Sequence, residues 1–190
     1  HIMSTFEIIK TRKSVRTYQN KPVETDKIKM IVEAGNMAAG TPMAGEVYFN
    51  VITNAEVLKG IVNGAKAAMA NSGMEMLVKL SSNPSYDPIY GAPVAVVISA
   101  TRTDVPNIAA MARANAACAG ENMLLAATEL GLGSCYLESP VLAFNIPEVA
   151  QAARLPENTQ PQAMIVFGYT DDTDPHKEYP ANPENIVYVD

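Results

Sequence analysis

Apolar residues follow two patterns along this chain: short unbroken runs, and longer stretches in which they recur every three or four positions. The unbroken runs at 94–100 and 163–169 are rich in valine and isoleucine. Such runs are typical of strands that are buried on both faces of a sheet. Weaker patterns predict strands at 48–53 and 134–137. The last apolar run, 186–189, also predicts a strand, and a terminal strand must pair with another edge.

Helical spacing of apolar residues predicts five helical regions. In the first, Phe6, Ile8 and Ile9 are expected to face the core, and Ser4 or Thr5 is expected to cap the first turn. The longest region is crowded with alanine, which permits close approach of another helix, either at the centre of a dimer or within one chain. The five regions are residues 4–12, about 25–37, 55–80 with a glycine interruption, 107–130 and 145 to about 155.

The loops and the length indicate how the chain is organised. Residues 40–45 break a helical region, and the long loop 81–93 contains three prolines and two tyrosines. Long loops of this kind are often functional. A chain of 190 residues suits one domain. We therefore expect one domain over 1–190, with the polar, proline-rich residues 170–190 as a C-terminal arm and His1-Ile2 as a cloning remnant.

Charge and cysteine content exclude several classes of protein. The net charge is -6, so nucleic acid and anionic membranes are poor partners. No apolar run approaches the roughly 20 residues of a membrane span. No signal-peptide pattern precedes the first helix, and we expect a cytoplasmic protein. Two cysteines and two histidines are too few for a disulfide framework or a zinc site, so Cys118 is expected to be a small core residue and Cys135 a structural one.

A basic cluster, Arg12-Lys13-Ser14-Val15-Arg16, lies near the start of the chain. It combines two guanidinium groups, an ammonium group and a hydroxyl, with no carboxylate among them, in a chain that is acidic overall. This concentration of charge favours an anionic partner. Phosphate suits the cluster, because a guanidinium group binds phosphate through two parallel hydrogen bonds. The alternative is a solvated helix end.

A second motif follows the alanine-rich region, where residues 130–135 read Leu-Gly-Leu-Gly-Ser-Cys. Together with the basic cluster, residues 122–127 and residues 167–169, in matching order and spacing, this motif resembles the nitroreductase family of FMN-dependent oxidoreductases. The resemblance covers nearly the whole chain. It implies an α+β fold with a central mixed or antiparallel sheet flanked by helices, and an intertwined homodimer with FMN at the subunit interface. It also implies that residues 186–189 join the sheet of the partner.

Motifs of other enzyme classes are absent. The chain has no Walker A lysine motif, Gly131-x-Gly133 lacks the third glycine of a Rossmann site, and Gly133-Ser134-Cys135 is not a nucleophile elbow. Without a catalytic triad or a metal cluster, the side chains themselves offer little chemistry. A reactive cofactor would explain this, because the protein then supplies positioning and electrostatics. No side chain is expected to be catalytic, and flavin N5 would carry the reaction.

The resemblance also implies where the cofactor binds. Arg12 and Arg16 would hold the FMN phosphate or its ribityl chain, and Ser14 would donate to the same region. Lys13 would lie beside the pyrimidine edge, where positive charge stabilises the anionic reduced flavin.

The family resemblance places a second contact region at Tyr136-Leu137-Glu138-Ser139, which would pass the isoalloxazine ring. The backbone N–H groups of Glu138 and Ser139 would reach N5 and O4. The side chain of Glu138 is interpreted equally well as an exposed loop carboxylate.

The chain departs from the family in two segments. Members commonly carry a Pro-Ser-x-x-Asn-x-Gln-Pro segment that reaches the flavin of the partner subunit. Here Thr41 replaces the serine only with a register shift, Met43 stands near the asparagine position and Gly45 near the glutamine. The polar contacts to the ring and its redox potential are therefore expected to differ. Near the C-terminus, where members often have a Lys-x-Arg pair, Lys177 is the candidate phosphate partner, and a solvated tail residue is the alternative.

We expect a ping-pong reaction in which NAD(P)H reduces FMN and hydride then passes to a small electron-poor acceptor, such as a nitroaromatic or a quinone. Tyr86 and Tyr90 either cover the open face of the flavin or anchor their loop. Two alternatives remain open at this point. One is a specialised flavin reductase that acts on activated alkenes or removes halogen, and the other is a flavin-binding or sensing protein with weak turnover.

Overall fold

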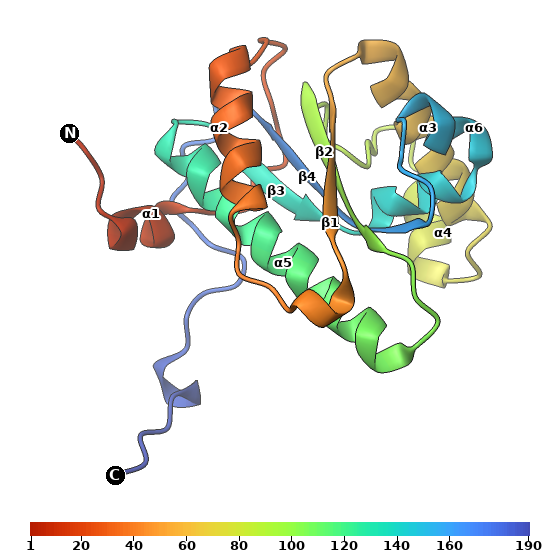
Figure 1. The fold of residues 1–190 in the computed structure, drawn as a ribbon. Coiled ribbons are helices and arrows are strands. Elements are labelled where there is room, and N and C mark those ends of the chain that lie inside the picture. The colour runs from red at the N-terminus through yellow and green to blue at the C-terminus, as the bar shows by residue number, and fades with distance from the viewer.

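A computed structural model describes residues 1–190, and a four-stranded antiparallel sheet forms its centre (Figure 1). Its order is β1-β2-β4-β3, so β1 and β3 are the edges. Every neighbouring pair is antiparallel, which decides between the mixed and the antiparallel sheet expected from the sequence. The strands are β1 (Val47–Ile52), β2 (Val94–Thr101), β3 (Gly133–Leu137) and β4 (Thr159–Gly168).

Six α-helices and three short 3-10 helices surround the sheet, and all five predicted helical regions are present. The third region is divided at Gly73, which has a φ of 73°, a left-handed conformation that glycine adopts readily. No helix is both long enough and apolar enough to cross a membrane. The helices are α1 (Thr5–Thr11), α2 (Thr25–Asn36), η1 (Pro42–Ala44), α3 (Ala55–Ala70), α4 (Glu75–Ser81), α5 (Pro106–Glu129), η2 (Ser139–Asn145), α6 (Pro147–Ala152) and η3 (Pro183–Asn185).

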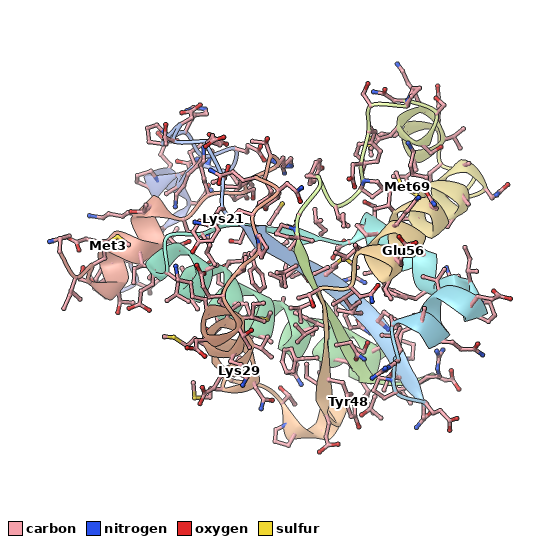
Figure 2. The ribbon with its side chains drawn as sticks, turned by 90° about the horizontal axis from the view of Figure 1, so that it is seen from above. Met3, Lys21, Lys29, Tyr48, Glu56 and Met69 are labelled. Carbon is pink, nitrogen blue, oxygen red and sulfur yellow. The ribbon has the colours of Figure 1, made fainter.

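The core consists of two large apolar clusters, one on each face of the sheet, and a third cluster of three alanines. In β2, residues 94, 96 and 98 pack with residues of α2 and α5, whereas residues 95 and 97 pack with residues of α3 and η2. Successive strand residues point to opposite faces, so a strand covered on both sides is apolar throughout. Figure 2 shows the two layers from above, with Lys29 on α2 and Met69 on α3 on opposite sides of the strands.

Ser4 caps α1 as predicted, in a capping box with Glu7. Two other expectations, about which residues lie in the core, are wrong. In α1, however, only Ile8 is buried, whereas Phe6 is 75% exposed and Ile9 is exposed as well. The helix is seven residues long and stands at the side of the body, so only one of its faces is covered (Figure 1). Cys118 lies on the exposed face of α5 and is not a core residue.

The C-terminal segment does not form a strand within the chain. Residues 186–189 follow η3 without pairing to any edge, and their apolar side chains are exposed. Figure 1 shows this tail leaving the body on the side of α1. The strand predicted from the sequence therefore has no partner edge in its own chain.

Candidate functional site

The basic cluster follows α1 and runs alongside the edge strand β3. Ser14 forms a parallel bridge with Ser134, and the Val15 N–H donates to the Ser134 carbonyl at 2.9 Å. Val15 is buried, and its Cγ1 would come within 2.9 Å of a Cβ at Gly133. Only glycine allows this close approach of the two segments. The buried valine thus fixes the cluster to the sheet while its charged neighbours stay at the surface.

Each cation of the cluster meets a carboxylate from a distant part of the chain. Two of the three carboxylates belong to the tail that follows β4. Hydrogen bonds from the cations lower the pKa of Asp172 and of Glu178, because they stabilise the ionised carboxyl group. The cluster therefore gathers anionic groups even within its own chain. The pairs are Arg12 Nε with Glu121 Oε1 at 3.5 Å, Lys13 Nζ with Asp172 Oδ1 at 2.6 Å, and Arg16 with Glu178.

Lys177 of the C-terminal segment lies near Arg12, although it lines a separate pocket. Its Nζ donates to the Ile9 carbonyl at 2.7 Å. Burial lowers the pKa of Lys177, the positive charge of Arg12 lowers it further, and Glu121 opposes the change. An ammonium group in this position is short of negative charge. A phosphate monoester would supply that charge, so the residues present fit the phosphate of FMN.

A pocket of about 490 Å³ opens beside the cluster. Arg12 and Lys13 form one wall, and residues 131–133 and 170–175 contribute to the others. The volume lies in the range of pockets that hold small ligands, roughly 300–1,000 Å³. The pocket thus joins the two cations nearest to α1 with space for an anionic group.

The second predicted contact region lies where β3 ends. Tyr136 is half-buried, with its ring edge 2.9 Å from the position that a Cβ on Gly120 of α5 would occupy. Leu137 is buried, and Ser139 begins η2. The exposed Glu138 carboxylate accepts a hydrogen bond from Arg113 on α5 at 2.8 Å. This stretch is therefore held by α5 on one side and by the core on the other.

The loop 83–93 lies next to the basic cluster. The Arg16 guanidinium stands 6.0 Å from the centre of the Tyr90 ring, and Tyr86 and Tyr90 pack edge to face at 6.2 Å. Lys66 on α3 donates to the carbonyls of Asn83 and Tyr86 at 3.1 and 3.0 Å and so anchors the loop. This role of Lys66 cannot be predicted from the sequence, because a lysine in a helical region is usually solvated.

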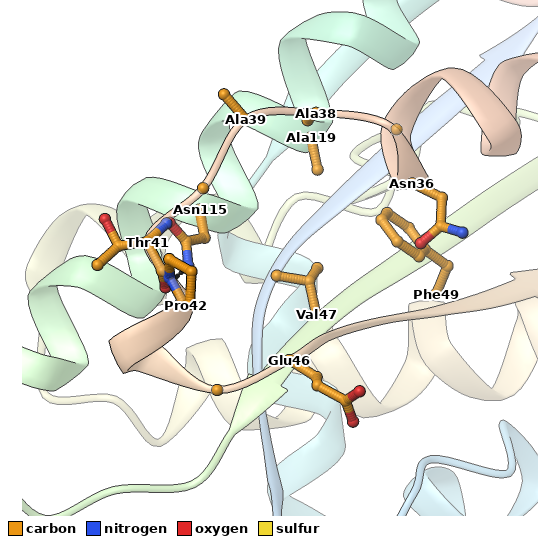
Figure 3. A pocket seen from close by; sticks show the side chains of 13 residues that line it. Asn36, Ala38, Ala39, Thr41, Pro42, Glu46, Val47, Phe49, Asn115 and Ala119 are labelled. Atoms are coloured by element: carbon orange, nitrogen blue, oxygen red, sulfur yellow. Dashed lines mark hydrogen bonds between the residues drawn. The ribbon is translucent and has the colours of Figure 1, made fainter.

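The Thr41–Gly45 segment lies elsewhere in the chain. It lines a different pocket, of about 310 Å³, together with Asn115 and Ala119 of α5 (Figure 3). This pocket shares no lining residue with the pocket beside the basic cluster. Within the segment, Met43 is 69% exposed. One chain therefore carries the two predicted flavin-contacting parts at separate places on its surface.

The protein side chains offer little chemistry of their own. No three His, Cys, Asp or Glu groups are placed to hold a metal ion. Burial raises the pKa of the Cys135 thiol, which keeps it protonated and unreactive at neutral pH. What the arrangement supplies is positive charge, an aromatic loop and backbone groups at the end of β3. These features are suited to binding and orienting a reactive group rather than to replacing one.

An antiparallel sheet between two helical layers, with a basic cluster held against the edge strand β3, defines the class of this protein as α+β. The sequence model of the Nitroreductase family matches residues 9–169. Because this match covers most of the chain, the chain belongs to the nitroreductase family.

Individual relatives agree with this assignment. The chain is 26% identical, over 167 residues that make up 88% of it and 78% of the relative, to a Methanothermobacter thermautotrophicus protein named as a candidate NADH dehydrogenase/NAD(P)H nitroreductase. It is similar to the FMN-bound nitroreductase of Bacteroides fragilis, with a TM-score of 0.87, 29% identity, and 99% and 100% of the two chains covered. The NADPH:FMN oxidoreductase of Vibrio harveyi, solved with NAD+, shares the fold at a TM-score of 0.70 and 20% identity, over 98% of this chain and 76% of that one.

Proposed function

We propose that this protein is an FMN-dependent oxidoreductase that takes hydride from NAD(P)H and reduces small electron-poor acceptors by a ping-pong reaction. The observation that carries the proposal is the basic cluster with Arg12, Lys13 and Arg16, held against the edge strand β3 through Ser14 and Val15, with Lys177 of the C-terminal segment near Arg12. These cations come from both ends of the chain, and they fit a phosphate monoester. The FMN in the similar Bacteroides fragilis structure supports the same ligand.

The roles of the residues follow from their positions. Arg12, Arg16 and Lys177 would hold the phosphate, and Ser14 would add a hydrogen bond beside them. Lys13 would supply positive charge that offsets the charge gained on reduction. The backbone at Glu138 and Ser139 would orient the ring, kept in place by the ion pair of Glu138 with Arg113. When bound, FMN supplies the hydride-carrying chemistry that no side chain here provides.

We further propose a homodimer in which each flavin site uses both chains. The two flavin-contacting parts lie at separate pockets of one chain, so a single flavin needs a second copy to meet both. The exposed face of α5 carries the small residues Ala114, Ala117 and Cys118, which allow another helix to approach closely. The unpaired apolar tail also needs an edge to pair with.

The decisive experiment is anaerobic reduction of the purified protein. We expect a yellow protein whose released cofactor runs as FMN on chromatography, and whose flavin absorbance is bleached by NADH or NADPH and restored by a nitroaromatic or a quinone. FAD as the released cofactor, or no flavin after reconstitution with excess FMN, would contradict the proposal. Bound FMN that neither nicotinamide reduces would favour the sensing protein with weak turnover.

A further inference from the structure

Asn115 is the one buried asparagine in the alanine-rich helix α5. Its Oδ1 accepts a hydrogen bond from the Thr41 N–H at 2.8 Å, and its Nδ2 donates to the Thr41 carbonyl at 3.0 Å. The side-chain amide thus binds both backbone groups of one residue, as a neighbouring strand would (Figure 3). A buried amide costs free energy unless it is paired in this way. Its presence among alanines therefore points to the segment that it holds.

The other end of the same segment is also anchored. The Glu46 N–H donates to Thr101 Oγ1 at 3.1 Å, at the end of β2. Gly45 has a φ of 78°, and a Cβ there would lie 2.6 Å from Thr101 Oγ1. Only glycine combines this backbone conformation with so close an approach. The segment is thus held at Thr41 by α5 and at Gly45 by the sheet.

Between these anchors the side chains of Pro42 and Met43 are exposed, whereas Ala44 is buried. Pro42 starts the single turn of η1, and Met43 is largely exposed. Both lie away from the basic cluster of their own chain, since the two pockets share no lining residue. Two anchors on an exposed turn are more than the core of one chain requires, because only Ala44 of η1 is buried.

We propose that Asn115 is a positioning residue of the flavin site. It fixes the Thr41–Gly45 segment in one conformation, so that the segment completes the flavin site built on the basic cluster of the other subunit. This inference rests on the proposed function, and it assigns a role to a residue that touches neither flavin nor substrate. An anchored segment binds more tightly than a mobile one, because less conformational freedom is lost on binding.

The first test compares two asparagines of α5. Asn115→Ala removes both hydrogen bonds to Thr41, whereas Asn122→Ala removes a single bond of 3.0 Å to the Ala34 carbonyl of α2. We expect Asn115→Ala to raise the FMN dissociation constant about tenfold, and Asn122→Ala to change it by less than about twofold. FMN titration by fluorescence gives the constants, and thermal melting of the flavin-free proteins shows whether both variants fold.

A conservative variant supplies a pH signature. Asn115→Asp keeps the acceptor for the Thr41 N–H but loses the donor to the Thr41 carbonyl. Protonation of the new carboxyl group restores that donor. We therefore expect the ratio of the mutant to the wild-type dissociation constant for FMN to fall towards one as the pH is lowered. A ratio that does not change with pH would contradict the role of the two bonds.

The sharpest test asks which subunit the segment serves. Co-expression of Asn115→Ala and Arg12→Ala chains with different tags yields mixed dimers. If the segment acts across the interface, one of the two sites in a mixed dimer has an intact cluster and an intact segment. We expect that site to bind FMN with wild-type affinity, at half the wild-type stoichiometry, while neither mutant homodimer does so.

The outcomes separate this inference from the proposed function. A wild-type protein that fails to bind FMN overturns both. A wild-type protein that binds FMN tightly, together with an Asn115→Ala variant of equal affinity, overturns only the positioning role of Asn115. Mixed dimers with no site of wild-type affinity overturn the action across the interface, because a segment that served its own chain would leave both sites damaged.

Discussion

Arg16 lies between a carboxylate and an aromatic ring. The hydrogen bond to Glu178 raises the pKa of the guanidinium above its already high usual value, and the Tyr90 ring lies 6.0 Å away. The side chain is partly exposed, so the ion pair with Glu178 contributes little to stability. An incoming phosphate would compete with this exposed carboxylate. Arg16 is thus a permanently charged group held ready for an anion.

Arg16→Ala is expected to weaken FMN binding roughly tenfold to a hundredfold, because a charge-assisted hydrogen bond to phosphate contributes about 1.5–3 kcal/mol. The melting temperature of the flavin-free protein should barely change. Fluorescence titration with FMN measures the affinity, and Lys29→Ala, which removes an exposed lysine on α2, is the matched control. Equal dissociation constants for wild type and Arg16→Ala would show that Arg16 plays no part in the site.

Lys177 predicts a pH dependence of FMN binding. In the flavin-free protein its pKa is lowered, chiefly by burial and then by Arg12. A bound phosphate would raise that pKa, so binding takes up a proton. The affinity for FMN should therefore fall, on the order of tenfold, as the pH rises through the lowered pKa of the free protein.

Titrations from about pH 7 up to about pH 10.4, the ordinary pKa of lysine, test this dependence. Lys177→Arg keeps its charge throughout this range and should bind FMN with an affinity that changes less with pH. The same fall in affinity for wild type and Lys177→Arg would assign the dependence to another group.

Part of the candidate site can be predicted from the sequence, because its residues are neighbours in the chain. The cluster around Ser14 and the stretch ending at Ser139 are of this kind, although their roles toward FMN stay predictions. Asn115, Arg113 and Lys66 cannot be found in this way, since their roles depend on partners that only the fold brings near. A lone polar residue among alanines is the one signal that points to Asn115.

At the scale of the elements, the site depends on the contact between the basic cluster and β3. Gly133 lies at this contact, and an added Cβ would come within 2.9 Å of Val15 and 3.0 Å of Thr170. The neighbours must move to admit a methyl group. Because Val15 precedes Arg16 directly, any movement also displaces the cations.

Gly133→Ala is expected to lower the free energy of unfolding by about 1–3 kcal/mol and to reduce FMN retention. Gly60→Ala is the matched control, because a Cβ at Gly60 in α3 meets nothing within 4 Å. It should stabilise the protein by roughly 0.5–1 kcal/mol, since alanine favours the helix. Denaturant unfolding measures both effects. A Gly133→Ala protein as stable as the wild type would show that the contact between Gly133 and Val15 has room for a methyl group.

The elements themselves could be predicted well, because residues 94–98 of β2 and 163–167 of β4 are buried and apolar throughout. The order of the strands in the antiparallel sheet could not be predicted, since it depends on pairings between strands that are distant in the sequence. Periodicity also failed to show which helical face is covered. Phe6 and Cys118 are exposed because the structure leaves one side of α1 and of α5 without a neighbour.

At the scale of the whole molecule, α5 connects the parts of the site. It holds the Thr41 segment through Asn115, pairs with Arg12 through Glu121, and pairs with Glu138 through Arg113. The same helix exposes a row of small residues. In the proposed dimer, the helix that orders both flavin-contacting parts would also be the one that meets its counterpart. The cytoplasmic location stays a prediction.

Removal of the residues after Asn182 should weaken dimerisation and FMN retention together. The deletion removes the exposed apolar residues 186–189, which are proposed to pair with a strand edge of the partner. Sedimentation measures the mass, and absorbance measures the flavin content. Glu184→Ala, which keeps the apolar residues, is the control. A full-length protein that is a monomer at micromolar concentration and still holds FMN would refute the shared site as a whole.

The unpaired tail also determines how assembly can go wrong. When the C-terminal arm of one copy docks on a second copy, the arm of the second copy need not dock back on the first. Mutual exchange gives a closed, domain-swapped dimer, whereas one-way exchange through the same joint adds chain after chain and produces an open fibre. Residues 186–189 stand clear of the body and are free to take either course. In the proposed dimer the face of α5 would hold the reciprocal pair closed, so a bulky substitution there is expected to favour the open fibre.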